Sequence, residues 1–123
     1  MLIVYDSLTG NVRRFVDKLG LPNLRIQDGL TVGEPFILIT YTTGLGFVPD
    51  STKQFLEDNS AHLIGVATSG NKNFGNYYAL AADIIAKQYE VPVIHKFEFS
   101  GLPSDVELFM KGVKEHEIHR AEQ

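Results

Sequence analysis

Three short segments of the sequence combine hydroxyl, amide and glycine residues in patterns that suit a phosphorylated, planar ligand. The first is Ser7-Leu8-Thr9-Gly10-Asn11, which follows an apolar run and precedes a helical pattern. Its hydroxyls, its backbone N–H groups and the positive end of the helix could converge on one phosphate. The alternative is that Thr9 or Asn11 only caps the helix, which is worth about 1 kcal/mol.

The second segment is Thr42-Thr43-Gly44-Leu45-Gly46-Phe47. Its glycines allow the backbone to approach a flat ligand closely, and they allow a peptide to rotate between donating and accepting orientations. Such a peptide suits the N5 atom of a flavin, which accepts a hydrogen bond when oxidised and donates one when reduced. The alternative is a flexible connection that binds nothing.

The third segment is Ser69-Gly70-Asn71-Lys72-Asn73-Phe74-Gly75. It offers two amides and several backbone N–H groups to the polar edge of a ring system, and Phe74 as a face for stacking. The alternative is a solvated turn with Phe74 folded into the core.

The elements that must position these segments follow from hydrophobic periodicity. For example, Val12, Phe15, Val16 and Leu19 recur at helical spacing, and Gly20 ends the pattern. Capping-box patterns at Ser51-x-x-Gln54 and Ser104-x-x-Glu107 predict two further helix starts. We expect strands over 2–5, 24–26, 35–41, 62–68 and 91–99, helices over 12–19, 51–56, 77–89 and 104–113, and a polar, frayed tail over 114–123.

Alternation of strands and helices, with continuously apolar central strands, predicts a parallel sheet covered on both faces. Five strands in one short domain spanning residues 1–123 suit a flavodoxin-like α/β sandwich of three layers, with sheet order 2-1-3-4-5. Ligands of such folds bind at the carboxyl ends of the strands. The three polar segments should therefore meet at one edge of the sheet.

Composition narrows the possible functions. The 123 residues include no cysteine, which excludes disulfides, Fe–S clusters and thiol chemistry, so redox chemistry would need a bound cofactor. The net charge of -4 argues against a nucleic-acid binder. No apolar run approaches the ~20 residues of a membrane span, so we expect a soluble, cytoplasmic protein, and a monomer.

Several other chemistries lack their residues. A receiver domain would need an acidic pair after the first strand and a phosphoacceptor after the third, but Asp6 stands alone and Thr42 occupies the second place. The glycine patterns of nucleoside triphosphate and dinucleotide sites are absent. The segment His116-Glu117-Ile118-His119 lacks the spacing of a zinc motif, so we expect no metal site.

Taken together, these motifs resemble the NrdI family of flavodoxin-like proteins. The most specific phrase is Ser69-Gly70-Asn71-Lys72-Asn73-Phe74-Gly75, and the resemblance extends through most of the chain. Flavodoxins carry a last hydroxyl in the phosphate loop, and Val12 stands in its place here. The resemblance implies an FMN site formed by Ser7, Thr9, Gly10, Asn11, Val12, Thr42, Thr43, Gly44, Ser69, Gly70, Asn71, Asn73, Phe74 and Gly75.

The family also implies a function, with chemistry on FMN and no catalytic side chain. Reduced FMN would react with O2 to supply an oxidant, superoxide, for assembly of the di-manganese tyrosyl-radical cofactor in the small subunit of class Ib ribonucleotide reductase. The implied partners are that subunit and a flavin reductant. A general flavodoxin-type electron carrier for another reductase is the alternative. A small flavin reductase using a nicotinamide cofactor fits less well, because no nicotinamide fingerprint is present.

The scarcity of acidic residues near the expected ring bears on redox behaviour. Residues 42–49 and 70–77 contain no carboxylate, and Asp50 and Glu98 are the nearest candidates for negative charge at the ring. A carboxylate about 8 Å from the N1 atom of reduced flavin costs roughly 2 kcal/mol in an effective dielectric of about 20, or roughly 90 mV per electron. We therefore expect the second electron to enter the flavin at a moderate potential.

Overall fold

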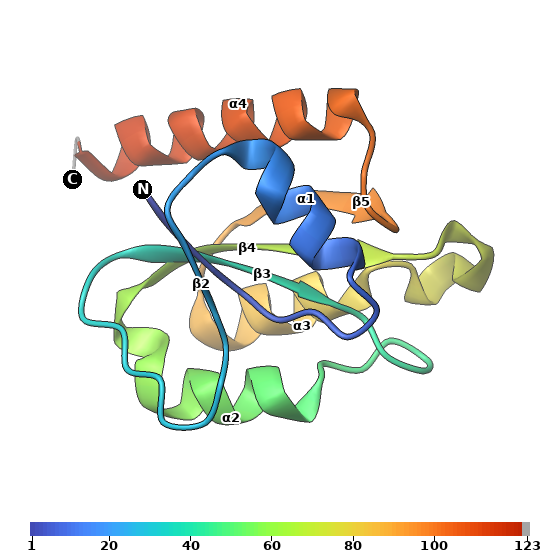
Figure 1. Ribbon diagram of the computed structural model, residues 1–123, viewed down its shortest axis with the longest axis horizontal. Helices are drawn as coiled ribbons and strands as arrows, with labels where there is room; N and C mark the ends of the chain where they lie inside the picture. Colours follow the sequence, from blue (N-terminus) through green and yellow to red (C-terminus); the bar gives the residue numbers. More distant parts are fainter. Residues whose placement is uncertain (122–123) are drawn as a thin grey trace.

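Five parallel strands form the centre of the molecule in the order β2-β1-β3-β4-β5, in agreement with the predicted topology (Figure 1). The structure is a computed structural model that describes residues 1–121 of the chain, with side chains described to residue 116. The strands are β1 (Leu2–Tyr5), β2 (Asn23–Arg25), β3 (Phe36–Tyr41), β4 (Leu63–Gly70) and β5 (Val93–Glu98). The helices are α1 (Asn11–Leu19), α2 (Asp50–Asn59), α3 (Leu80–Tyr89) and α4 (Pro103–Ala121), with short 3-10 segments η1 (Ser60–His62) and η2 (Lys72–Tyr77).

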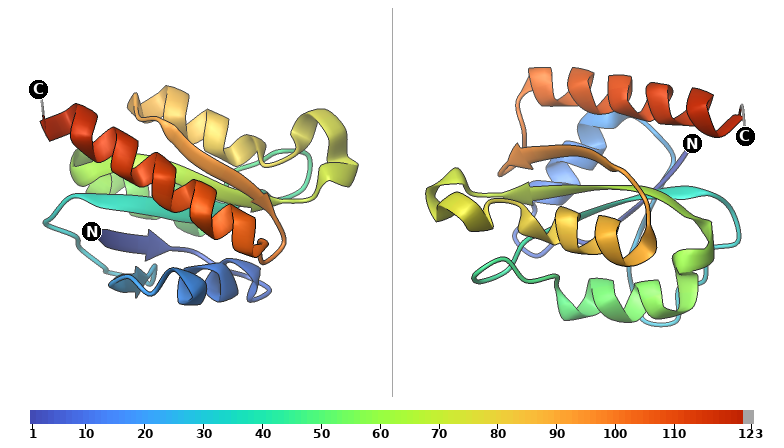
Figure 2. Two further views of the ribbon diagram at one scale, coloured as in Figure 1. Left: turned by 90° about the horizontal axis from the view of Figure 1, so that it is seen from above. Right: turned by 180° about the vertical axis from the view of Figure 1, so that it is seen from behind.

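The helices cover both faces of the sheet. Helices α1 and α4 lie on one face, and α2 and α3 lie on the other (Figures 1 and 2). Each face has its own cluster of buried apolar side chains. The molecule is therefore the three-layer α/β sandwich expected from the alternation of elements.

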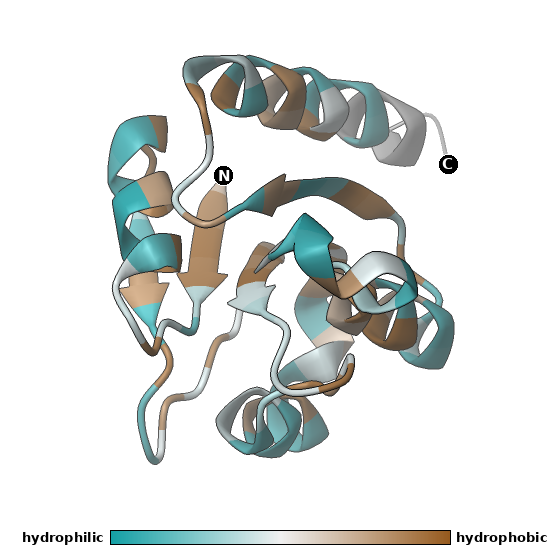
Figure 3. Cartoon of the chain, turned by 90° about the vertical axis from the view of Figure 1, so that its right-hand side faces the viewer, coloured by the Kyte–Doolittle hydropathy of each residue, from teal (hydrophilic) through white to brown (hydrophobic). Residues whose placement is uncertain are grey.

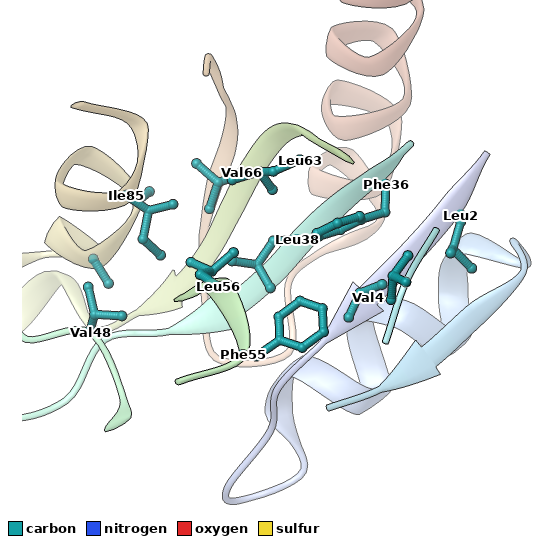
Figure 4. Packing of buried hydrophobic residues seen from close by; sticks show 13 residues of the cluster. Leu2, Val4, Phe36, Leu38, Val48, Phe55, Leu56, Leu63, Val66 and Ile85 are labelled. Atoms are coloured by element: carbon teal, nitrogen blue, oxygen red, sulfur yellow. The ribbon is translucent and has the colours of Figure 1, made fainter. Parts of the chain in front are cut away.

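The strand side chains alternate between the two clusters. In β1, Leu2 and Val4 pack towards α2 and α3, whereas Ile3 packs towards α1 and α4. Figure 4 shows the first cluster, in which Phe55 of α2 packs against Phe36 of β3 with ring centroids 5.7 Å apart. Because both faces are covered, the central strands are apolar at nearly every position.

Three aromatic rings join α1, β5 and α4 on the other face. Phe15 stacks on Phe97 with ring centroids 3.9 Å apart, and Phe109 meets Phe15 edge to face at 5.8 Å. All three are fully buried. This packing fixes the orientation of α1, whose N-terminus points towards the carboxyl edge of the sheet.

Both predicted capping boxes are wrong. Helix α2 begins at Asp50, and Ser51 lies inside its first turn, where its hydroxyl donates to the carboxylate of Asp6 and not to the helix backbone. Helix α4 begins at Pro103, a residue that suits the first helical position because it lacks an N–H. The carboxylate of Asp105 accepts a hydrogen bond of 2.7 Å from the N–H of Leu102, so Asp105 replaces Ser104 and Glu107 as the capping side chain.

Other boundaries also differ from the prediction. Helix α3 begins at Leu80 rather than at residue 77, because Gly75 and Ala79 take left-handed conformations with φ of 57° and 48°. The helical backbone of α4 continues to Ala121, well beyond the predicted end at residue 113, and whether its last turns fray stays a prediction. Side chains from Glu117 onward, and with them most of the His116-Glu117-Ile118-His119 segment, lie outside the described residues.

The described part of the chain lacks two kinds of feature. Over residues 1–121, no helix is both long and apolar enough to cross a membrane. The described side chains include no group of three histidine, aspartate or glutamate residues placed to hold a metal ion.

Candidate functional site

The carboxyl ends of β1, β3 and β4 open into a cleft of about 340 Å³. Figure 3 looks onto this end of the molecule, where the loops that follow the strands face the viewer. The volume lies within the roughly 300–1,000 Å³ of small-molecule sites. The cleft is lined by Ser7, Leu8, Thr9, Asn11, Val12, Tyr41, Thr42, Thr43, Gly44, Ser69, Gly70, Asn71, Phe74, Tyr77, Ala79 and Phe99.

One end of the cleft is the N-terminus of α1. The residue before the helix is Gly10, with φ of 90°, a conformation that favours glycine and provides no side-chain cap. The alternative in which Thr9 or Asn11 is the cap is therefore wrong. In the first turn, the N–H of Arg13 donates to the Ser7 hydroxyl at 3.4 Å. Because the first N–H groups of a helix have no partner within it, the backbone at Asn11 and Val12 offers donors and a positive potential to the cleft.

The loop after β3 is closed by its own hydrogen bonds. The N–H of Thr43 donates to the carbonyl of Phe47 at 2.9 Å, and the N–H of Phe47 donates back to Thr43 at 2.8 Å. Thr42 is held as well, because its Oγ1 accepts a bond of 3.3 Å from the N–H of Ala81 in α3. These contacts restrain the loop and hold Gly44 at the cleft with φ of 50°. Whether the loop is a flexible connection or part of a binding site stays untested.

The loop after β4 places an aromatic ring at the cleft. Asn71 Oδ1 accepts a bond of 2.9 Å from the N–H of Asn73, and this turn begins η2. The side chain of Phe74 is 51% exposed, so the alternative with Phe74 folded into the core is wrong. Gly70 must be glycine because an added Cβ would lie 2.7 Å from the backbone nitrogen of Ala79.

The structure brings most of the predicted site residues together. Eleven of the fourteen line the cleft, and the exceptions are Gly10, Asn73 and Gly75. Gly10 and Gly75 have positive φ and shape the loops, whereas the backbone N–H of Asn73 donates to the capping side chain of Asn71. Whether any of these residues binds a ligand stays a prediction.

Two of the predicted site residues offer fewer side-chain groups to a ligand than their residue types suggest. The side chain of Val12, in the first turn of α1, is 1% exposed and packs in the core, so its backbone is the part left to serve a ligand. The hydroxyl of Ser69 donates to the carbonyl of Phe99 at 2.6 Å. That hydroxyl therefore holds the loop after β5 in place.

Sequence reasoning missed five lining residues, of which Phe99 is the most informative. It follows β5, has φ of 49° and is 51% exposed at the cleft. The predicted topology contained a signal for it, since β5 also ends at the carboxyl edge. The other missed residues are Leu8, Tyr41, Tyr77 and Ala79.

The side chains that line the cleft are uncharged. No acidic side chain belongs to its lining. Asp6 lies behind it, buried, and accepts hydrogen bonds from the hydroxyls of Ser51 and Thr52. Burial, and then the charge of Asp6, raise the pKa of the Tyr41 phenol above its ordinary value, so this group is a neutral hydroxyl at neutral pH. The site therefore suits an anionic group at the α1 end and a neutral ring elsewhere.

The chain is similar to known proteins of one family over most of its length. The family model described as NrdI flavodoxin-like matches residues 3–111. The chain is 53% identical over 113 residues to Protein NrdI of Bacillus licheniformis, covering 91% of this chain and 86% of that protein. It is 47% identical over 124 residues to Protein NrdI of Macrococcus caseolyticus, covering 99% and 96%.

Solved structures show the same fold at low sequence identity. A short-chain flavodoxin associated with a non-canonical PDU bacterial microcompartment superposes with a TM-score of 0.71 at 19% identity, covering 92% of this chain and 93% of that one. The Fusobacterium nucleatum flavodoxin bound to flavin mononucleotide superposes with a TM-score of 0.69 at 16% identity, covering 96% of each chain.

Proposed function

Because the chain belongs to the NrdI flavodoxin-like family, we propose that its cleft binds FMN and that the protein activates class Ib ribonucleotide reductase. The bound and reduced cofactor supplies one electron to O2, which yields superoxide for assembly of the di-manganese tyrosyl-radical cofactor of the reductase's small subunit. A flavin reductant is the second protein partner of this proposal.

The observation that carries the proposal is the N-terminus of α1, preceded by Gly10 with no side-chain cap, at one end of a cleft whose lining has no carboxylate. A phosphate there would accept hydrogen bonds from backbone N–H groups and from the Thr9 hydroxyl, and it would be stabilised by the helix dipole. Ser7, Thr9, Gly10, Asn11 and Val12 would form this end. A dianion therefore finds donors without needing a lysine.

The other two loops suit the ring. Thr42, Thr43 and Gly44 would lie along its N5 edge, where the loop's hydrogen bonds hold a glycine peptide close. Asn71 and Phe74 would meet its opposite side, together with Gly70 and Ser69. Asn73 and Gly75, which lie outside the lining, would act through the shape of their loop. The exposed side chains of Phe74 and Phe99, which line the cleft, would shield the ring from water.

Two measurements, made one after the other, test this function. First, the purified protein, or protein refolded with FMN, should be yellow and retain about one FMN per chain; colourless protein after refolding with FMN would overturn the site. Second, reduced protein, O2 and manganese-loaded small subunit should give the electron paramagnetic resonance signal of a tyrosyl radical. Protein that binds FMN and reduces another reductase, but yields no radical, would be a general flavodoxin-type electron carrier instead.

A further inference from the structure

Arg14 contacts the proposed phosphate end without lining the cleft. Its Nη2 donates to Asn11 Oδ1 at 2.7 Å, and its Nε donates to Ser100 Oγ at 2.9 Å. The guanidinium also lies against Gly10, where an added Cβ would be 2.8 Å from Nη1. One arginine therefore joins the start of α1 to the loop that follows β5.

These contacts fix which way the Asn11 amide faces. Its Oδ1 accepts from Arg14 and also from Ser100 Oγ, at 2.9 Å. A guanidinium can only donate hydrogen bonds, so turning the amide over would place two donors against each other. Asn11 lines the cleft, and Nδ2 is the polar atom of its side chain left for a ligand. In this arrangement the side chain of Asn11 can only donate a hydrogen bond to a ligand, from Nδ2.

The loop that carries Ser100 is held firmly enough to serve as an anchor. Lys18, one turn beyond Arg14, donates from Nζ to the carbonyls of Ser100 and Gly101 at 3.0 and 2.9 Å. On its inner side, Gly101 packs so closely on Phe15 that a Cβ would lie 2.7 Å from the ring. Arg14 therefore holds Asn11 against a fixed part of the fold.

We propose that Arg14, anchored by Ser100, is a positioning residue that orients the Asn11 amide to donate to the flavin's phosphate. It thereby sets a preference for phosphorylated flavin over riboflavin. This inference rests on the proposed function, since it takes the ligand of the cleft to be FMN. It assigns a role to a side chain that belongs to neither the phosphate loop nor the cleft lining.

The test compares the affinities of the intact apoprotein for FMN and for riboflavin, measured by quenching of flavin fluorescence. Arg14→Met should weaken FMN binding roughly tenfold, the worth of about one hydrogen bond to a charged group, and leave riboflavin affinity unchanged. The matched control is Arg13→Met. Arg13 lies on the same helix but pairs with Asp17 at 3.9 Å on the surface, so its loss should change FMN affinity by less than about twofold.

A second variant tests the amide directly. Asn11→Asp keeps an oxygen for Arg14 and Ser100 but replaces the Nδ2 donor with a second carboxylate oxygen. It should weaken FMN binding at least as much as Arg14→Met, again with riboflavin affinity retained.

Two results would overturn the positioning role. They are an unchanged preference for FMN over riboflavin in Arg14→Met, whether both affinities fall equally or neither changes, or an equal effect of Arg13→Met. Wild-type apoprotein that takes up neither flavin would instead overturn the proposed function, and this inference with it.

Discussion

Thr52 Oγ1 donates to a carboxylate oxygen of Asp6 across 2.8 Å, although 46 residues separate the two in the chain. The Ser51 hydroxyl donates to the same oxygen, and Thr40 Oγ1 lies 2.8 Å from Thr52 Oγ1. Asp6 directly precedes the first polar loop, whereas Ser51 and Thr52 belong to the first turn of α2. This buried network thus ties the proposed phosphate loop to the helix at which the loop after β3 ends.

Replacing Asp6 should destabilise the fold. Asp6→Ala removes the acceptor of two hydroxyls, one of them fully buried, and should lower the free energy of unfolding by about 2 kcal/mol. Urea denaturation followed by circular dichroism measures this. Asp17→Ala removes the same charge from an exposed side chain and should have little effect. Equal stability of the two variants would mean that the Asp6 network contributes nothing.

Gly70→Ala should damage both the fold and the site. The added methyl group would overlap the backbone of Ala79, and overpacking of this kind costs about 1–3 kcal/mol. Ala79 also lines the cleft, so FMN affinity should fall too. Gly33→Ala is the control, because that site is exposed with open space around it. Comparable melting temperatures for the two variants would contradict the close approach.

Asp105 should stabilise the protein in a pH-dependent way. Burial alone would raise its pKa, but hydrogen bonds from the Leu102 N–H and from His95, 2.7 Å away, outweigh burial and lower the pKa below its ordinary 3.8. The folded state therefore binds fewer protons than the unfolded chain between these values. The contribution is present above about pH 4 and is lost as the pH falls through the lowered pKa.

The matching variant is Asp105→Asn. Its deficit in unfolding free energy relative to the wild type should be full at pH 6 and should shrink towards pH 2.5, as measured by urea denaturation at each pH. Glu107→Gln, an exposed change on the same helix, should show little difference at either pH. A deficit of Asp105→Asn that is constant with pH would show that the lost charge is not its cause.

Introducing a carboxylate at the cleft should separate the two flavin potentials. In the wild type, whose cleft lining has no acidic side chain, we expect the second one-electron potential to lie close to the first. Asn71→Asp keeps the oxygen that accepts from Asn73 and should lower the second potential by roughly 90 mV for a charge about 8 Å away. Spectroelectrochemical titration checks this.

The control for net charge is Asn23→Asp, at the exposed start of β2. It should leave both potentials nearly unchanged. A wild-type second potential hundreds of millivolts below the first would contradict the electrostatic argument.

Thr9→Val should affect binding but not folding. The side chain is exposed and does not cap α1, so the free energy of unfolding should change by less than about 0.5 kcal/mol. FMN affinity should fall while riboflavin affinity is retained, because the lost hydroxyl would face the phosphate. An unchanged FMN affinity, measured by fluorescence quenching, would remove Thr9 from the proposed site.

The architecture could be predicted from the sequence. Apolar runs, helical spacing, residue composition and capping patterns together predicted the five strands and the four α-helices, though not the two 3-10 segments. The alternation of these elements predicted both the sheet order and the edge at which the polar loops meet. These properties are local or follow from general rules of chain connection, so they can be read without coordinates. The loops themselves were identified for the same reason, since glycine and amide residues cluster directly after apolar runs.

The roles of individual polar side chains depend on the tertiary structure and could not be predicted from the sequence. The hydroxyl of Ser51 matches a local capping pattern, yet it bonds to Asp6, which comes from a distant strand end. Arg14 and Ser100 meet across 86 residues, and Phe99 reaches the cleft because Ser69 holds its carbonyl. A short polar side chain can bond to any of several hydrogen-bond partners of similar strength. The packing of the whole chain determines which of these partners lies within reach. Periodicity therefore predicted the sheet, but folding decided which groups face the ligand.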